Sequence, residues 1–337
     1  MGSLRVAVVG ATGLVGRTIL RVLEERSFPV GELSLLASKR SAGTTVSFAG
    51  TDVTVRELTP EGVTDSDVTF FSAGADISRA YAPLAADTGA LVVDNSSAFR
   101  ADPEIPLVVP EVNGDLLTDP PYRGIVANPN CSTIQLVVAL EPLHRCFDLI
   151  EVIVATYQSV SGSGGKGVRT LERELAGSID GGSPYPHPIS GNVLPHIDTF
   201  GADGWSGEER KMMNETRKIM RLPALHIIAT TVRVPVAIGH SEAVYARFTN
   251  DIGLSGVRTA LGMAPGVIVA DDPERNIYPM ALDAAGRDEV FVGRLRRDPD
   301  DPHGLVFWIV ADNVRKGAAT NAVQCAELAL SIENVHA

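Results

Sequence analysis

Cysteine is scarce in this sequence: Cys131, Cys146 and Cys325 stand far apart in 337 residues. So few thiols exclude a disulfide framework, and their scatter excludes a zinc site of the usual Cys and His spacing. The sequence therefore predicts no metal ion and a reducing compartment, the cytoplasm.

Positive charge and long apolar runs are also in short supply. The chain has 29 Lys and Arg against 41 Asp and Glu, a formal net charge of −12. That balance disfavours nucleic acid or an anionic membrane as the main partner, although a few local cations can still bind a small anion. No apolar run is long enough to span a bilayer, and residues 4–9 run directly into a glycine turn without a secretory signal. The length instead predicts two globular domains.

What the sequence does have, at its start, is a glycine motif. The buried strand predicted at 6–9 is followed by Gly10, Gly13 and Gly16, and then by a helix with an apolar face. This G-x-x-G-x-x-G spacing, placed between a strand and a helix, is a variant of the dinucleotide-binding fingerprint. The pattern predicts the first unit of a Rossmann fold.

Basic residues follow the second predicted strand, at 33–37. An NAD site usually has an acidic residue there to bind the ribose hydroxyls. Here Lys39 and Arg40 lie between Ser38 and Ser41, which suits a ribose 2′-phosphate, so the predicted cofactor is NADP. A solvated basic turn is the alternative. After the strand at 68–71, the small residues 72–74 would allow close approach of a cofactor.

Cys131 lies between a predicted strand at 124–127 and an apolar helix that begins near residue 131. A helix N-terminus favours a thiolate, which is a good nucleophile. The alternative is that Cys131 is a small buried apolar residue.

After residue 150, long predicted strands dominate. A glycine-rich loop is expected at 161–167, an irregular segment at 177–206, and a helix at 208–219 capped by Ser206. The simpler interpretation of the charged face of this helix is a row of solvent-exposed ion pairs. Arg233, on an apolar strand, requires an anionic partner or an exit to solvent, and His240 is a candidate base or a structural histidine.

These patterns predict an α/β chain with an N-terminal Rossmann domain and an α+β domain built on a mixed or antiparallel sheet. The expected boundaries are 1–130 with 317–337 for the dinucleotide-binding domain, and 131–316 for the catalytic and dimerisation domain.

The motifs, taken in order, resemble those of aspartate-β-semialdehyde dehydrogenase. The matching stretches run nearly from end to end: GATGLVG at 10–16, SKRSAG at 38–43, DNSSAFR at 94–100, NPNCST at 128–133, YQSVSG at 157–162, EERKMMNETRKI at 208–219, VRVPV and GHSE within 232–242, and KGAATNAVQ at 316–324.

The resemblance implies reversible, NADP-dependent reductive dephosphorylation of β-aspartyl phosphate to aspartate β-semialdehyde through a cysteine thioester and thiohemiacetal. That reaction serves lysine, threonine, methionine and diaminopimelate biosynthesis. The family's assembly is a homodimer or a dimer of dimers.

The family's roles fall on matching residues. Cys131 would be the nucleophile, His240 the acid and base, and Gln158 the orienting residue. The substrate-binding residues would be Arg233 for the α-carboxylate, Glu208 for the ammonium, Arg100 and Lys211 for the phosphate, and Asn130. The cofactor-binding residues would be Gly10, Thr12, Gly13, Leu14, Val15, Ser38, Lys39, Arg40, Ser41, Ser72, Ala73, Gly74, Ser161, Gly162 and Asn321. Whether Glu208 or Glu209 faces the substrate stays open.

Three rival functions remain. N-acetyl-γ-glutamyl-phosphate reductase shares the glycine motif and a cysteine, but its acylated amine has no need of an acid such as Glu208. Glyceraldehyde-3-phosphate dehydrogenase is disfavoured because no acid follows the second strand. An inactive NADP sensor on the same scaffold is disfavoured by Cys131 and His240.

Overall fold

The computed structural model describes residues 3–118, 122–178 and 181–331. The chain divides into two compact units. Unit 1 comprises residues 1–129 and the C-terminal stretch from Ala318, and unit 2 comprises residues 130–317. Within the described residues, no helix is long and apolar enough to cross a membrane.

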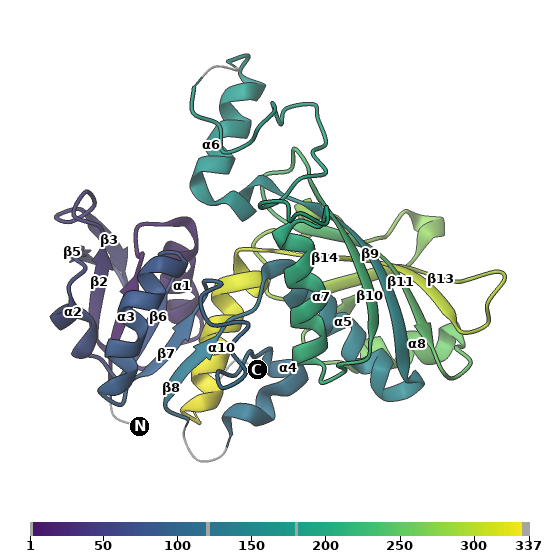
Figure 1. Ribbon diagram of the computed structural model, residues 1–337, viewed down its shortest axis with the longest axis horizontal. Coiled ribbons are helices and arrows are strands. Elements are labelled where there is room, and N and C mark those ends of the chain that lie inside the picture. Colours follow the sequence, from purple (N-terminus) through teal and green to yellow (C-terminus); the bar gives the residue numbers. More distant parts are fainter. Residues whose placement is uncertain (1–2, 119–121, 179–180, 332–337) are drawn as a thin grey trace. The chain divides into compact units, whose positions relative to one another are not determined.

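Unit 1 is built on a parallel sheet of six strands in the order β5-β2-β1-β6-β7-β8 (Figure 1). Val6 and Val8 of β1 pack on one face, and Ala7 and Val9 pack on the other, as the alternation of a strand buried on both sides requires. The strands are β1 (Leu4–Val9), β2 (Val30–Ala37), β5 (Arg56–Glu57), β6 (Val68–Phe71), β7 (Leu91–Asp94) and β8 (Gly124–Ala127), with a separate hairpin of β3 (Thr45–Phe48) and β4 (Thr51–Thr54).

Helices cover both faces of this sheet. Ile19 of α1 (Leu14–Glu25) and Val323 of α10 (Thr320–Ala329) share one core cluster, and Ala82 of α3 (Ala75–Asp87) belongs to the cluster on the opposite face. The last helix therefore returns to the first sheet, as the sequence predicts. The shorter helices are α2 (Pro60–Thr64), α4 (Pro110–Asn113) and the 3₁₀ turn η1 (Gly114–Leu117).

Unit 2 is built on a mixed sheet in the order β10-β9-β11-β14-β13-β12. Strand β9 pairs parallel with β10 and antiparallel with β11, and β14 is antiparallel to both β11 and β13. The strands are β9 (Leu149–Gln158), β10 (His226–Arg233), β11 (His240–Phe248), β12 (Val267–Val269), β13 (Val290–Arg297) and β14 (Gly304–Ala311).

The helices α5 (Cys131–Phe147), α7 (Gly207–Ile219) and α8 (Leu254–Gly262) lie along one side of this sheet (Figure 1). Helix α6 (Gly164–Leu175) has its own small core of Val160, Leu171, Ile189 and Leu194. The remaining elements are the 3₁₀ turns η2 (Val160–Ser163) and η3 (Pro273–Arg275), α9 (Ala281–Ala284) and the π-helical turn η4 (Arg315–Ala319).

The predicted fold class, a Rossmann unit followed by a domain with a mixed sheet, is confirmed. One local prediction was wrong, because residues 161–167 form η2 and the start of α6 instead of a loop.

Candidate active site

Cys131 is the first residue of α5, a helix of 17 residues, and its side chain is half-buried. Asn130 caps that helix with extended backbone, and its Oδ1 accepts from the backbone N–H groups of Ser132 (3.0 Å) and Thr133 (3.3 Å). The cysteine therefore lies at the positive end of the helix dipole, which stabilises a thiolate.

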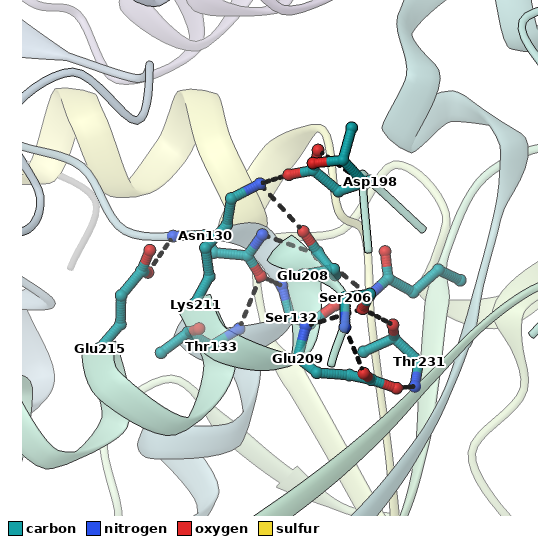
Figure 2. A network of polar contacts seen from close by, with 12 residues as sticks. Asn130, Ser132, Thr133, Asp198, Ser206, Glu208, Glu209, Lys211, Glu215 and Thr231 are labelled. Carbon is teal, nitrogen blue, oxygen red and sulfur yellow. Dashed lines mark hydrogen bonds and ion pairs between the residues drawn. The ribbon is translucent and has the colours of Figure 1, made fainter. Parts of the chain in front are cut away.

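The side-chain amide and the backbone N–H of Asn130 donate hydrogen bonds to two glutamates of α7. Its Nδ2 donates to Glu208 Oε1 at 2.8 Å, and its backbone N–H donates to Glu215 Oε2 at 2.7 Å (Figure 2). Glu208 Oε1 also accepts from Nε2 of Gln158 at 3.1 Å. Glu208 thus connects Asn130, the residue before Cys131, to the end of β9.

Glu209 has a different task from its neighbour. It closes a capping box with Ser206 at the start of α7, and it accepts from the backbone N–H of Thr231 (Figure 2). Glu208, with 5% of its surface exposed, is the one that joins the polar network around Asn130.

His240 is completely buried, and the backbone N–H of Ser159 donates to its Nδ1 at 3.1 Å. Because a backbone N–H can only donate, Nδ1 is the acceptor and the neutral ring carries its proton on Nε2. Within the described part of the chain Nε2 has no hydrogen-bond partner. Burial, together with the charge of Arg233, holds the pKa of His240 well below its usual 6.5, so the ring is neutral at pH 7.

Ser159 in turn donates a hydrogen bond to Asn313. The sequence did not indicate a role for either residue. Asn313 Oδ1 accepts from the hydroxyls of Ser159 and Ser161, both at 2.9 Å, and from the backbone N–H of Gly239 at 3.0 Å. Ser161 is thereby buried in this cluster, which fixes the orientation of the His240 ring.

Arg233 ends β10 and is 5% exposed. Its Nη1 donates to the Ser159 carbonyl at 2.7 Å, whereas its Nε has no partner among the described residues. A Cβ added to Gly162 would lie 2.5 Å from Arg233 Nη1 and 3.3 Å from His240 Nε2. Glycine at 162 therefore permits the close approach of this backbone to both side chains, and the open Nε suits a carboxylate.

Lys211, one turn along α7 from Glu208, binds Asp198 Oδ2 at 2.7 Å and Glu208 Oε2 at 3.4 Å (Figure 2). Burial of Asp198 favours its neutral form, but hydrogen bonds from Lys211 and Thr199 lower the pKa of the carboxyl. Asp198 is a second residue that the sequence did not indicate.

Gly317 lies directly against Cys131. A Cβ there would be 2.9 Å from the Cβ of Cys131. The KGAATN stretch therefore brings a residue without a side chain to the cysteine, a packing requirement that sequence spacing does not reveal.

In unit 1 the glycine motif connects β1 to α1. Gly10 has φ +85°, a Cβ there would lie 2.8 Å from the Ser72 carbonyl oxygen, and a Cβ at Gly16 would lie 2.3 Å from the Gly10 carbonyl oxygen. Helix α1 begins after Gly13 without a side-chain cap, so its first N–H groups suit a pyrophosphate. Thr12, Leu14 and Val15 belong to the same turn, and these residues fit a dinucleotide.

The basic turn after β2 presents exposed Ser38, Lys39 and Arg40, and the Ser41 hydroxyl lies 3.5 Å from that of Thr12. The turn thus adjoins the glycine motif at the carboxyl end of the sheet. Ser72 donates to the Val9 carbonyl, and Ala73 and Gly74 follow as exposed residues before α3.

Arg100 and Asn321 are both bound to the loop after β8. Arg100 Nε donates to the Asn128 carbonyl and its Nη2 to the Asn95 carbonyl, both at 2.9 Å. Asn321 is fully buried and donates to Asn128 Oδ1 at 2.7 Å and to the Val108 carbonyl at 2.9 Å. The structure thus gives Asn321 a supporting position under this loop.

No group of three or more His, Cys, Asp or Glu side chains that could hold a metal ion occurs in residues 3–118, 122–178 and 181–331.

Comparisons with known proteins agree with this arrangement. Residues 5–119 match the model of the semialdehyde dehydrogenase NAD binding domain, and residues 140–316 match that of the semialdehyde dehydrogenase dimerisation domain. Aspartate-semialdehyde dehydrogenase of Aquifex aeolicus is 52% identical over 96% of this chain and 97% of its own length, and that of Bacillus subtilis is 48% identical over 96% of each.

Solved structures give the same result. Aspartate semialdehyde dehydrogenase II of Vibrio cholerae, complexed with ASA, superimposes with a TM-score of 0.94 at 43% identity, over 98% of this chain and 99% of that one. The Candida albicans enzyme with NADP gives 0.73 at 26% identity, over 98% and 100%. The chain belongs to the aspartate-semialdehyde dehydrogenase family.

Proposed function

We propose that this chain catalyses the reversible, NADP-dependent conversion of β-aspartyl phosphate to aspartate β-semialdehyde and inorganic phosphate, the step that leads toward lysine, threonine, methionine and diaminopimelate. The observation that carries the proposal is the arrangement around Asn130. It combines a nucleophile at a helix N-terminus, a buried carboxylate (Glu208) and a buried arginine with an open Nε (Arg233).

In the biosynthetic direction, the Cys131 thiolate attacks the β-carbonyl carbon. A C–S bond forms, the bond between the carbonyl carbon and the phosphate oxygen breaks, and phosphate leaves with the electron pair. The product is a thioester on Cys131. The positive end of the α5 dipole is suited to stabilise negative charge at this point.

Bound NADPH would supply the hydride that reduces the thioester, which leaves a tetrahedral adduct on Cys131 with an alkoxide oxygen. Because Nδ1 of His240 accepts from the Ser159 N–H, the neutral ring presents its Nε2–H to that oxygen as a hydrogen-bond donor. The alkoxide then forms the carbonyl of aspartate semialdehyde as the C–S bond breaks, and the Cys131 thiolate is restored.

Each charge of the substrate has a counterpart. The α-carboxylate is assigned to Arg233, the ammonium to Glu208, and the phosphoryl group to Lys211 and Arg100, with Asn130 and Gln158 orienting the reacting carbonyl. A hydrogen bond to a charged group contributes about 1.5–3 kcal/mol. Asp198 is the anion bound to Lys211 in this structure, so the incoming phosphate would compete with it.

The cofactor is proposed to be NADP. The support is the exposed Lys39 and Arg40 beside the glycine motif, where a ribose 2′-phosphate would lie. Ser38, Ser41 and the glycine turn would complete the binding of the phosphates.

The functional assembly is proposed to be a homodimer, either alone or within a dimer of dimers. The support is the sheet face of unit 2 opposite α5, which exposes Ile153 at 45% and Tyr157 at 40% of their surface. A cavity of about 630 Å³ lined by Tyr278, Met280 and Trp308 lies on the same unit. A large apolar face of this kind is typical of a subunit interface.

The test is NADPH formation from aspartate semialdehyde with and without inorganic phosphate. We expect turnover that requires phosphate and that is lost in Cys131→Ala, while that variant still binds NADP. Turnover with the N-acetylated five-carbon semialdehyde and none with aspartate semialdehyde would instead establish N-acetyl-γ-glutamyl-phosphate reductase activity, although Glu208 disfavours it.

A further inference from the structure

A second layer of polar side chains lies beneath the nucleophile and the base. Gln135 follows Cys131 by four residues on α5, so both lie on one face of that helix. Glu242 follows His240 by two residues on β11, so both lie on the buried face of that strand. Gln135 Nε2 donates to the carbonyl of His240 at 3.4 Å, which joins the two elements.

Glu242 is 0% exposed, and neither carboxyl oxygen accepts a hydrogen bond from any described residue. Oε1 of Gln135 is also buried without a donor in the described chain. Across the sheet, Glu242 pairs with Thr156 on β9 and Ile309 on β14, so its strand neighbours bring no cation. An ionised carboxylate without a donor in such a place is strongly destabilising.

The orientation of the Gln135 amide shows that its Oε1 requires a hydrogen-bond donor. Turning the amide over would place Oε1 against the His240 carbonyl, so that two acceptors would face one another. Nε2 must therefore point toward His240, which leaves Oε1 in need of a donor. A protonated carboxyl has one O–H donor and one carbonyl acceptor, and can pair with both groups of a primary amide.

Burial raises the pKa of the Glu242 carboxyl well above its usual 4.5, and the Gln135 amide opposes this rise. The charged and titratable groups on the surrounding elements include Cys131 on α5, His240 on the same strand, Arg233 on β10, Glu208 on α7, and the buried Asp312 and Lys316 after β14. None of them contributes to the pKa shift of Glu242. Burial thus favours the form that the hydrogen-bond pattern requires.

We propose that Glu242 holds its proton at neutral pH and forms an acid–amide pair with Gln135 that positions Cys131 relative to His240. Glu242 is a positioning residue, because it acts on the reacting groups through α5 and β11. The role in turnover rests on the proposed function, whereas the protonation state of Glu242 does not.

The first test is the infrared difference spectrum of the full-length wild type minus Glu242→Gln at pH 7. We expect the difference to contain the C=O stretch of a protonated carboxylic acid. Glu174 provides the control, because its buried carboxylate accepts from the backbone N–H groups of Ile189 (2.7 Å) and Ser190 (2.8 Å). Glu174→Gln should remove a carboxylate band, and a carboxylate band lost from Glu242→Gln as well would overturn the proposal.

The second test compares Glu242→Gln with Glu242→Leu. A glutamine can still pair with the Gln135 amide, so kcat and the pH dependence of Cys131 alkylation by iodoacetamide should match the wild type. Leucine leaves Gln135 Oε1 unpaired, and kcat should fall at least about tenfold with little change in KM, because a small displacement of reacting groups is costly.

Wild-type turnover of the leucine variant would refute the positioning role. A changed alkylation profile in Glu242→Gln would show that a charge had been removed, which would refute the neutral state. If Glu242→Leu does not fold, the infrared and alkylation comparisons still decide the matter. Both are also independent of whether aspartate semialdehyde proves to be the substrate.

Discussion

The surroundings of Cys131 depend both on neighbouring residues in the sequence and on residues brought close by the fold. The Asn130 cap is local and can be predicted from sequence, because it depends on residues 130–133 alone. The support for His240 is not local: Ser159 and Asn313 lie 81 and 74 or more residues away from the groups they contact. No spacing rule connects such residues, so they emerge only from the fold.

Gly317→Ala should impair catalysis without unfolding the protein. The added Cβ would lie 2.9 Å from the Cβ of Cys131, so the start of α5 must shift. We expect kcat to fall by about tenfold or more, as for other small displacements of reacting groups. Gly262→Ala is the matched control, because a Cβ there meets nothing within 4 Å. Equal kcat values for the two variants would contradict this packing.

Glu242→Gln should change how stability depends on pH. Between the ordinary pKa of 4.5 and the raised pKa of the folded protein, Glu242 binds a proton in the folded state that the unfolded state lacks. The free energy of unfolding of the wild type should therefore fall, relative to the variant, by about 1.4 kcal/mol per pH unit as pH rises.

Urea unfolding of both proteins from about pH 5 to about pH 7 measures this difference, and a constant difference would contradict a neutral Glu242. His240 contributes with the opposite sign, because its lowered pKa reduces stability as pH falls below 6.5. Since His240 is present in both proteins, its contribution cancels.

At the scale of single elements, α7 shows what sequence patterns can and cannot resolve. The Ser206 to Glu209 spacing predicts a capping box, and the structure has one. The pattern could not decide which of two adjacent glutamates faces the site, because that depends on how α7 is rotated against α5. The glycine-rich residues 161–167 predict a loop, whereas the structure has η2 and the start of α6 there. Gly167 packs closely against the Val160 carbonyl, a contact that the local pattern does not reveal.

Glu208→Ala and Glu209→Ala should therefore fail in different ways. Without Glu209 the capping box is lost, and unfolding free energy should fall by about 1 kcal/mol with little effect on kcat/KM. Without Glu208, Asn130 and Gln158 lose their common acceptor, and kcat/KM for aspartate semialdehyde should fall steeply. Thermal unfolding and initial rates distinguish the two, and an exchange of the two phenotypes would reverse the assignment.

We propose that the turn after β2 selects NADP over NAD. Arg40→Glu should weaken NADP binding by about 10- to 100-fold and NAD binding much less, because only NADP has a 2′-phosphate to be repelled. Arg79→Glu, an equal charge change at an exposed position on α3, is the control. Equal loss of both cofactors in a titration of Arg40→Glu would remove the 2′-phosphate assignment.

For the whole molecule, the alternation of strands and helices before residue 130 and the long strands after 150 were sufficient to predict both sheets. The unit 2 sheet also has apolar residues on the face away from α5. A strand pattern alone cannot show whether such a face is exposed or covered by other elements. The match to a dimerisation domain supports the proposal that this face is a subunit interface.

Ile153→Lys should therefore weaken the dimer. Its side chain is 45% exposed on the outer face of β9, and a charge there would be buried without a partner on association. Leu116→Lys, at 43% exposure in unit 1, is the control. Sedimentation should give monomers for Ile153→Lys alone, and an unchanged assembly would exclude this face.

The central step of the proposed reaction is a covalent bond between the substrate and the sulfur of Cys131. Aspartate semialdehyde and NADP, mixed with the protein in the absence of phosphate, should allow oxidation to the thioester and no further step. Mass spectrometry of the intact protein, followed by peptide mapping, should find an aspartyl adduct on Cys131 that disappears when phosphate is added and never forms in Cys131→Ser. Phosphate-dependent turnover without such an adduct, or an adduct on another residue, would contradict the mechanism.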